Sequence, residues 1–566
     1  MTGRIAIVGT GPTGIYTAAH LLAAPGPLDL TLFEQAEEAG WGMPYDPDRN
    51  GPGMLANIAS IEIPPVGGMT LVDWLSAQDD AALAALGVER AAIDPRTFFP
   101  RVVLGAYFRD GLARVVAGGV ARGHRVAVRP LHRLEDVELR ADDVLLTLRG
   151  PDGETLREGF AHAVLATGHT FPDWTETRPG YFVSPYPTAA LRGLTNRHVG
   201  IRGTSLSAID AAVAVAQANG TFLRDAAGRL DFHPLPGADR FRLTLMSRKG
   251  LLPEADFFFP IPYEPCTHCT PEAVDALCAA GPSGLLEAVF DLFRAEIVAA
   301  DPDWAGRVGL ALLDADGFAR AYFAEREAAD PWTWAARNLE ESAADYARAR
   351  VVPWRYAILR THETVARMVP HLSPEDLERF HRGWKAVFVD NYATVPHESI
   401  ERLLALHRAG RIAVIRLGRD HRIDTAPEGG GAVLHLNGEE TRFDAFVEAT
   451  GQRALDAADI PFPSLLAQGA IRRPRLPDRA VGWDEDELPP LREVPGVELD
   501  EAFRPVNALG LSDGLYCLAL PFLLHRHPFH QGITSAEEMA ATVARAILGA
   551  DEGAAASARS AVLLAS

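Results

Sequence analysis

Three glycines near the start of the chain have the spacing of a dinucleotide-binding turn. Gly9, Gly11 and Gly14 form G-x-G-x-x-G, with Pro12 and Thr13 between them. In such a turn the first glycine allows a tight bend, the second lets the backbone approach a diphosphate, and the third lets helix and strand pack closely. The diphosphate would lie at the positive end of the following helix. We therefore expect these residues to bind a dinucleotide.

An acidic residue follows the second expected strand of this unit. Residues 28–33 have the pattern of a strand, and Glu34 comes directly after it, about twenty residues beyond the last glycine. A carboxylate at this point binds ribose hydroxyls and repels a 2′-phosphate. The ligand should therefore be FAD or NAD rather than NADP. The alternative is an ordinary strand–turn–helix whose glycines bind nothing.

A second strand–turn–helix pattern lies near residue 200. Gly203, Ser205 and Ser207 stand where a nucleotide fingerprint has glycines. Serine is small enough for close approach, although it tolerates positive φ less well than glycine. The next strand ends at Arg248 and Lys249, and cations at this point bind the 2′-phosphate of NADP. These residues predict an NADPH site, and a solvated basic loop is the alternative.

Cys266 and Cys269 form C-T-H-C, which could bind a metal or act as a redox dithiol. A zinc site needs about four ligands, and no second pair of suitable residues accompanies this one. In thioredoxin reductases, which such a dithiol would resemble, the pair precedes the nicotinamide-binding helix, whereas here it follows the second fingerprint. We expect a structural or incidental pair and no metal site.

The elements that must position these residues alternate between strand and helix, except in one long helical stretch. Two similar strand ends, at 166–168 and 449–451, both read Ala-Thr-Gly and mark where the chain crosses between nucleotide domains. The expected fold class is α/β, with two Rossmann-like dinucleotide-binding domains and a mainly helical insertion. The expected domains are an FAD-binding domain (1–192 and 440–566), an NADPH-binding domain (193–270 and 383–439) and the helical insertion (271–382).

Length and composition exclude several classes of protein. At 566 residues the chain needs more than one core, and 48% hydrophobic with 23% charged residues is ordinary for a globular protein. A net charge of −21 argues against binding nucleic acid or an anionic membrane surface. We expect no secretory signal and no bilayer-spanning run. Four cysteines do not suggest a disulfide framework, which fits the cytoplasm.

The order of these features resembles the flavoproteins with two dinucleotide-binding domains, and within them the single-component flavin monooxygenases. An acid-ended fingerprint opens the chain, a basic-ended one follows, and a late strand "GLYCLA" leads into "HQGITSAEE". The resemblance implies FAD in the first unit, NADPH in the second, and Gln531 and Gly532 beside the flavin ring. We expect Asn57 and Gly168 to contact the cofactor as well. A capping box of Ser535 and Glu538 should begin the last helix.

Four stretches, "MLANIASIEIPP", "FFPR", "GTSLSAID" and "SRKGLLP", are similar to bacterial FAD/NAD(P)-binding monooxygenases of secondary metabolism. Among these are the L-aspartate N-hydroxylases that form nitrosuccinate. The resemblance implies N-hydroxylation of a small amine or amino acid with NADPH and O₂. Two alternatives stay open: another FAD- and NADPH-dependent oxidoreductase, such as a C-hydroxylase or a reductase, and a nucleotide-binding protein without turnover.

A small acidic substrate would need cationic partners. Arg101 in "FFPRVV" and Arg526 in "LHRHPFHQG" could bind a carboxylate in bidentate fashion. His527 lies between His525 and His530, and one of these could hold a proton near neutral pH. We expect Arg101, Arg526 and His527 to be catalytic, although each could be a phosphate clamp, a helix-end charge or a surface group. The helical insertion could be a lid or the interface of a homo-oligomer.

Overall fold

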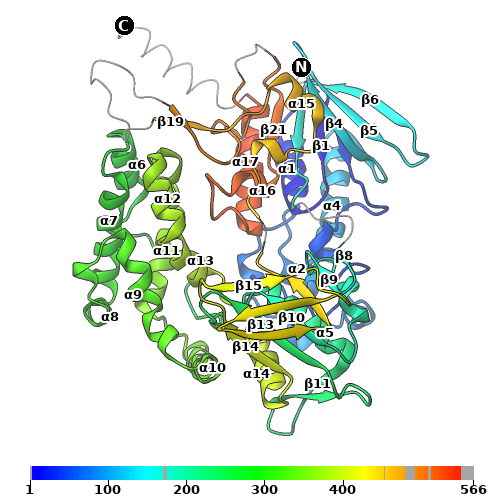
Figure 1. Cartoon of the computed structure of the whole chain (residues 1–566). Coiled ribbons are helices and arrows are strands. Elements are labelled where there is room, and N and C mark those ends of the chain that lie inside the picture. Colours follow the sequence, from blue (N-terminus) through cyan, green and yellow to red (C-terminus); the bar gives the residue numbers. More distant parts are fainter. Residues whose placement is uncertain (1–2, 170–174, 452, 478–490, 508–510, 550–566) are drawn as a thin grey trace.

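A computed structural model describes residues 3–169, 175–451, 453–477, 491–507 and 511–549. It contains two separate, mainly parallel sheets and a helical domain that stands along one side of both (Figure 1).

The first sheet is parallel and has the strand order β21-β7-β1-β2-β3. Four of its strands are mostly buried because both faces are covered, which is typical of parallel sheets, whereas the edge strand at residues 125–129 is only partly buried. The strands are β1 (Ile5–Val8), β2 (Asp29–Phe33), β3 (Arg125–Arg129), β7 (His162–Leu165) and β21 (Leu515–Cys517). Helix α1 (Pro12–Ala23) packs between α17 (Ile533–Ile547) and α4 (Arg101–Ala121) on one face.

An antiparallel sheet covers the opposite face of the first sheet. Its strands are β4 (Arg133–Leu139), β5 (Val144–Arg149) and β6 (Thr155–Phe160). Val137, Leu146 and Phe160 from this sheet share one apolar core with Ala6 and Phe33 of the parallel sheet. Short elements complete this unit: α2 (Leu71–Ser76), α3 (Asp80–Ala85), α15 (Pro463–Gln468) and α16 (Leu520–Leu523). The strand pair β19 (Arg475–Pro477) and β20 (Leu491–Glu493) packs against the helical domain, since Leu476 belongs to its core.

The second sheet has the order β14-β13-β10-β18-β9-β8 and is parallel except for the last pair. Its strands are β8 (Glu176–Arg178), β9 (Tyr181–Phe182), β10 (His198–Arg202), β13 (Arg242–Ser247), β14 (Ile412–Arg416) and β18 (Ala445–Glu448). Its helices are α5 (Leu206–Asn219) and α14 (His397–Arg408), and its accessory strands are β11 (Gly220–Arg224), β12 (Leu230–Pro234), β15 (His421–Asp424), β16 (Ala432–Leu436) and β17 (Glu439–Phe443).

Three strands lie in a different sheet from the one that we expected. The expected boundaries put β8, β9 and β18 in the first unit, but β18 pairs in parallel with β10 of the second sheet, β9 pairs with β18, and β8 pairs with β9. The reason is that the buried apolar strand β18 needs a hydrogen-bonded neighbour on each side, and in the second sheet it pairs with β10 and β9.

The helical domain is inserted between two neighbouring strands, since β13 and β14 pair directly. Its helices are α6 (Pro271–Ala279), α7 (Leu285–Ala300), α8 (Pro302–Arg307), α9 (Ala315–Ala328), α10 (Pro331–Ala347), α11 (Pro353–Ala366), α12 (Pro374–Arg382) and α13 (Lys385–Tyr392). An aromatic core of Phe290, Phe293, Phe318 and Trp384 holds them together. The domain continues ten residues beyond the expected end at residue 382, because Val387 and Phe388 of α13 belong to the same core.

Candidate functional site

Gly9 and Gly14 of the first fingerprint stand where no side chain fits. Gly9 has φ +101°, and a Cβ there would lie 2.3 Å from the carbonyl oxygen of Ala166. A Cβ at Gly14 would lie 2.0 Å from the carbonyl oxygen of Gly9. Gly11 caps α1 in an extended conformation. Backbone N–H groups therefore line the turn at the positive end of a helix, and this cradle fits a diphosphate.

Pro12 and Thr13 occupy the first turn of α1. A proline here loses nothing, because the first N–H groups of a helix have no partner within it. Thr13 is buried and its carbonyl accepts a hydrogen bond from Thr17 Oγ1 (2.7 Å).

The Glu34 carboxylate is held beside this turn. Its Oε2 accepts hydrogen bonds from the Thr10 N–H (3.1 Å) and Oγ1 (2.7 Å), and its Oε1 accepts one from the Ala36 N–H (3.0 Å). These contacts fix an anionic group at the carboxyl end of β2. The position fits a carboxylate that binds ribose hydroxyls.

The second fingerprint repeats the backbone of the first. The Gly203 N–H donates to Met246 O (2.7 Å), as the Gly9 N–H donates to Phe33 O (2.8 Å). Gly203 has φ +135°, and a Cβ there would lie 2.2 Å from the carbonyl oxygen of Ala449. The two turns therefore place their first glycine against the next strand of the sheet in the same way.

Serine at the second fingerprint position carries no strain. Ser205 caps α5 with φ −101°, which any residue adopts, so the doubt about positive φ does not apply. The third position is Ala208 and not Ser207, because the spacing from Gly203 is that of Gly9 to Gly14, and alanine also allows close packing there. Ser207 instead forms a hydrogen bond with the Tyr186 side chain.

The carboxyl end of β13 differs chemically from that of β2. Ser247 follows Met246 as Glu34 follows Phe33, so a hydroxyl replaces the carboxylate. Thr204 Oγ1 donates to Ser247 Oγ (3.2 Å), which matches the contact of Thr10 with Glu34. Arg248 comes next and is exposed at this edge.

Lys249 does not share this position. Its Nζ lies 2.8 Å from Glu327 Oε1 of α9 and 3.4 Å from the centre of the Phe323 ring. Burial is the largest effect on its ammonium group and lowers its pKa. We expected Lys249 to bind the 2′-phosphate; the structure instead directs it to the helical domain, so this expectation is corrected.

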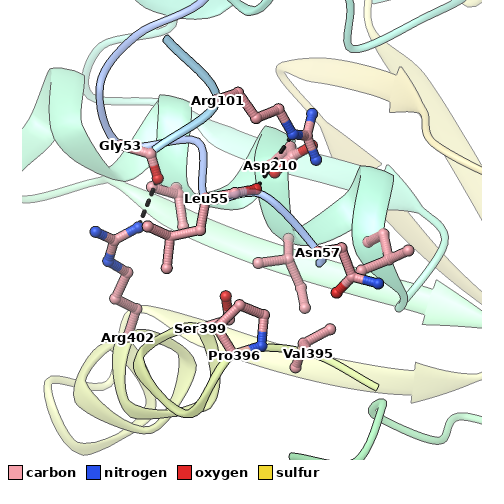
Figure 2. A pocket seen from close by; sticks show the side chains of 12 residues that line it. Gly53, Leu55, Asn57, Arg101, Asp210, Val395, Pro396, Ser399 and Arg402 are labelled. Atoms are coloured by element: carbon pink, nitrogen blue, oxygen red, sulfur yellow. Dashed lines mark hydrogen bonds and ion pairs between the residues drawn. The ribbon is translucent and has the colours of Figure 1, made fainter. Parts of the chain in front are cut away.

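A small pocket lies where the two dinucleotide units meet (Figure 2). Loop residues from Gly53 to Asn57, the start of α4, and helices α5 and α14 line it. Arg402 Nη1 donates to Gly53 O (2.6 Å) and closes one side. Asn57 Oδ1 is buried and has no hydrogen-bond partner among the described residues. It is an acceptor that still lacks a donor, which fits its expected contact with the cofactor.

Arg101 is already paired at this pocket. Its Nη2 lies 2.7 Å from Asp210 Oδ2 of α5, and its Nε donates to Leu55 O (3.1 Å). The guanidinium group therefore has an internal carboxylate partner. The expectation that Arg101 binds substrate is corrected to a positioning contact between the units.

The segment before α17 contacts the helical domain. Arg526 Nη2 donates to Pro370 O (2.5 Å), and His381 Nε2 lies 3.0 Å from His525 O. The rings of His527 and His530 lie 4.9 Å apart. The three expected catalytic residues are therefore not brought together. Arg101 lies at the pocket between the two dinucleotide units, whereas Arg526 and His527 lie beside the helical domain.

Burial keeps the histidines of this segment neutral. Desolvation, then repulsion from His530 and Arg526, lowers the pKa of His527 to about 3. Desolvation, then repulsion from His362, lowers the pKa of His530 to about 4. Desolvation likewise lowers the pKa of His525. These lowered pKa values argue against the expectation that one of them holds a proton near neutral pH.

Three expected cofactor contacts lie at the carboxyl edge of the first sheet. Gly168 follows β7 with φ +65° and open space around its Cα. Gln531 is exposed, with Nε2 donating to Pro528 O (3.1 Å), and Gly532 caps α17. The helix starts at Ile533 without a side-chain cap, so the expected capping box at Ser535 is wrong.

The cysteine pair belongs to the helical core. Glu296 Oε2 accepts hydrogen bonds from the backbone N–H groups of residues 267–269, and Arg360 Nη2 donates to its Oε1 (3.0 Å). Burial raises the pKa of Cys266 to about 11 and that of Cys269 to about 12. Thiols of this kind are poor nucleophiles, which favours the structural interpretation. Among the described residues no group of three or more His, Cys, Asp or Glu could hold a metal.

Sequence reasoning missed Ala208 and Ser247 of the second fingerprint, which could have been found by matching the two fingerprints letter by letter. It also missed His381 and Lys385 of the helical domain, which lie near His525. No local signal identifies these two, because their position depends on how the helical domain packs.

The chain is 43% identical over 545 residues to the uncharacterized protein YdhS of Escherichia coli (strain K12), covering 96% of this chain and 97% of that protein. The chain belongs to the YdhS family. Residues 270–392 match the family described as YdhS-like middle domain, and residues 6–170 match the one described as FAD-NAD(P)-binding. This second match confirms FAD and NAD(P) as the expected cofactors of this chain.

Solved structures resemble this chain in fold. The reduced form of ornithine hydroxylase from Pseudomonas aeruginosa matches with a TM-score of 0.50 and 13% identity, covering 97% of this chain and 99% of that chain. The ornithine N-hydroxylase of Kutzneria sp. 744, with reduced FAD, NADP⁺ and L-ornithine, matches with 0.49 and 13%, covering 97% and 100%. The expected fold class is confirmed. Within the described residues, no helix has both the length and the apolar composition to cross a bilayer.

Proposed function

We propose that the protein is an FAD- and NADPH-dependent monooxygenase that hydroxylates the nitrogen of a small amine or amino acid. One observation carries the cofactor assignment: two turns with the same backbone geometry end in opposite chemistry. Glu34 follows the strand in the first unit, whereas Ser247 and Arg248 follow it in the second. A carboxylate repels a 2′-phosphate, while a hydroxyl and a guanidinium bind one.

FAD would be held by Gly9, Gly11, Gly14 and Glu34, and at Gly9 and Gly14 there is no room for a side chain. When bound, it would supply hydride acceptance from the nicotinamide and activation of O₂. The chain would orient the reactants and exclude water from them. Gly168, Gln531 and Gly532 are proposed to lie near the ring, at the edge of the sheet where parallel folds bind ligands.

NADPH would be held at the start of α5. Gly203, Ser205 and Ala208 provide the close backbone approach, and Ser247 with Arg248 would bind the 2′-phosphate. Asn57 lies between the units, so its unpartnered Oδ1 is proposed to meet a cofactor group there.

The cofactor assignment is tested first, without substrate. The purified protein should be yellow, and under nitrogen NADPH should bleach the flavin at least tenfold faster than NADH at equal concentration. A colourless protein that refuses added FAD contradicts the whole proposal. Equal bleaching by both nucleotides contradicts the role of Arg248.

The reaction is tested next by a screen of amines and amino acids with O₂. A substrate should raise NADPH oxidation without raising hydrogen peroxide, and the product should contain one added oxygen on nitrogen. L-Aspartate is the first compound to try. If every compound leaves all the oxidation as peroxide, the protein is another FAD/NADPH oxidoreductase; if the flavin is never reduced, it has no turnover of this kind.

A further inference from the structure

Basic side chains from two parts of the chain meet beside the first sheet. His381 of α12 and Lys385 of α13 come from the helical domain, and Arg526, His527 and His530 come from the segment before α17. We call these five residues the basic junction. Direct contacts join its two sides: His381 Nε2 with His525 O (3.0 Å), and Arg526 Nη2 with Pro370 O (2.5 Å).

Both permanent cations of the basic junction lack a carboxylate partner. Lys385 and Arg526 are half-buried, and among the residues that the structure describes neither has a carboxylate within 4.0 Å. Burial alone lowers the pKa of Lys385. Burial lowers the pKa of Arg526, and Glu498 offsets this only in part. Charges that are partly withdrawn from water are stabilised by a partner of opposite sign, so these two half-buried cations favour an anion nearby.

The histidines of the basic junction add donors that can become cations. Burial, then the charge of Lys385, lowers the pKa of His381 to about 4. His530 Nδ1 is buried and has no hydrogen-bond partner among the described residues. Among the described residues, Asp456 acts on His525 and Glu498 acts on Arg526, while His362 adds positive charge beside His530. An arriving anion would therefore find donors rather than repulsion.

The fold fixes this cluster near the expected flavin edge. The Leu518 N–H donates to Leu165 O (3.0 Å), so the segment leaves β21 at the carboxyl edge of the first sheet, beside Gly168. Phe529 packs its ring against Phe380 and Phe388 of the helical domain. The helical domain thus both anchors the segment and contributes part of the basic junction.

We propose that the basic junction binds a carboxylate of a small acidic substrate, so that the YdhS-like middle domain supplies half of the substrate recognition. This rests on the proposed function. Lys385 and Arg526 would pair with the carboxylate, and His381 and His530 would donate N–H groups to it. A carboxylate favours protonated imidazole, so binding takes up protons and is tighter at lower pH.

Isothermal titration with succinate tests the proposal, because succinate carries carboxylates and no nitrogen to oxygenate. The full-length protein is loaded with FAD and titrated without NADPH at pH 6 and pH 8, in two buffers of different ionisation enthalpy. We expect saturable binding, proton uptake, and affinity at least tenfold higher at pH 6. Putrescine, a dication of similar length, should not bind.

Lys385→Met and its control Arg382→Met form a matched pair, and His381→Gln tests the proton uptake. Lys385→Met should weaken succinate binding at least tenfold, whereas Arg382→Met removes an exposed cation at the end of α12 and should leave it unchanged. His381→Gln should reduce the number of protons taken up. Equal affinity in the wild type and Lys385→Met, or equal affinity at both pH values, overturns the proposal.

The pyrimidine edge of the flavin could accept hydrogen bonds from the same donors. Titrating the apoprotein distinguishes this flavin contact from binding of a substrate carboxylate. Succinate that binds the apoprotein but not the FAD-loaded protein would assign the basic junction to the flavin and overturn the substrate assignment. Neither titration depends on turnover. A failure of the proposed function appears instead as a flavin that NADPH does not reduce, so the two failures are distinguishable.

Discussion

Arg101 Nη2 and Asp210 Oδ2 lie 2.7 Å apart, and this ion pair joins the first dinucleotide unit to the second. The side chains are only 14% and 8% exposed. The Tyr186 hydroxyl donates to the same carboxylate oxygen (2.5 Å). The pair therefore sets how the start of α4 meets α5, at the pocket of Figure 2.

Breaking this pair should destabilise the protein. Arg101→Met leaves the Asp210 carboxylate buried without its cation, and we expect a loss of about 3 kcal/mol in the free energy of unfolding, measured by urea denaturation. Arg109→Met, on the exposed side of the same helix, should cost less than about 1 kcal/mol. Arg101→Met with Asp210→Asn should cost less than the sum of the two single changes. Additive costs would contradict the coupling.

Arg248 should determine the choice of nucleotide. Arg248→Met should raise the KM for NADPH about tenfold, because a charge-assisted contact to the 2′-phosphate contributes about 1.5 kcal/mol, and should hardly change the KM for NADH. Lys249→Met should leave this preference intact, since its ammonium group pairs with Glu327. A larger loss of preference in Lys249→Met would reverse the assignment.

Ser247→Glu should convert the second turn toward the chemistry of the first. The new carboxylate would stand where Glu34 stands in the first unit and repel the 2′-phosphate. We expect the ratio of kcat/KM for NADPH to that for NADH to fall at least tenfold. Ser247→Gln, of the same size without the charge, is the control. An equal fall in both variants would indicate a steric effect.

Gly9→Ala should prevent FAD binding. Its Cβ would lie 2.3 Å from the Ala166 carbonyl oxygen, and φ +101° is unfavourable for alanine. Gly26→Ala has φ +95° but no neighbour within 4 Å, so it should cost about 1 kcal/mol of stability and keep the flavin. Flavin content per chain, read from the absorbance spectrum, checks both. A yellow Gly9→Ala protein would contradict the cradle.

Stability should fall as the pH drops from about 6.5 towards 4. In this window the unfolded chain protonates its histidines at the ordinary pKa of 6.5, while folded His527 and His530 stay neutral with pKa values of about 3 and 4. The unfolded state then binds more protons, so the free energy of unfolding decreases with falling pH. Each histidine contributes up to about 1.4 kcal/mol per pH unit. His527→Gln should flatten the slope of melting temperature against pH, whereas the exposed His233→Gln should not.

Most of the fold follows from local pattern. Buried strands, glycine turns and helical spacing identify both fingerprints and the helical domain, because each signal lies within a few dozen residues. The sheet that β18 joins could not be predicted, since Val447 is equally apolar in either sheet. Its pairing with β10 is set by residues far away in the sequence.

The candidate site was predictable where the backbone dominates and not where side chains choose distant partners. Gly9, Gly14 and Gly203 were found because a turn without room for Cβ atoms has few sequence solutions. Arg101 and Lys249 were assigned to ligands, yet they pair with Asp210 and Glu327 on other helices. A charged residue in sequence shows only that it needs a partner.

The helical domain leaves the second unit after β13 and returns to it through α14, which precedes β14. Its two ends lie side by side, because Ala255 and Val395 form a β-bridge, so α14 alone could complete the crossover from β13 to β14. Transplanting residues 270–392 between members of the family would therefore test whether this domain carries the substrate recognition proposed for it.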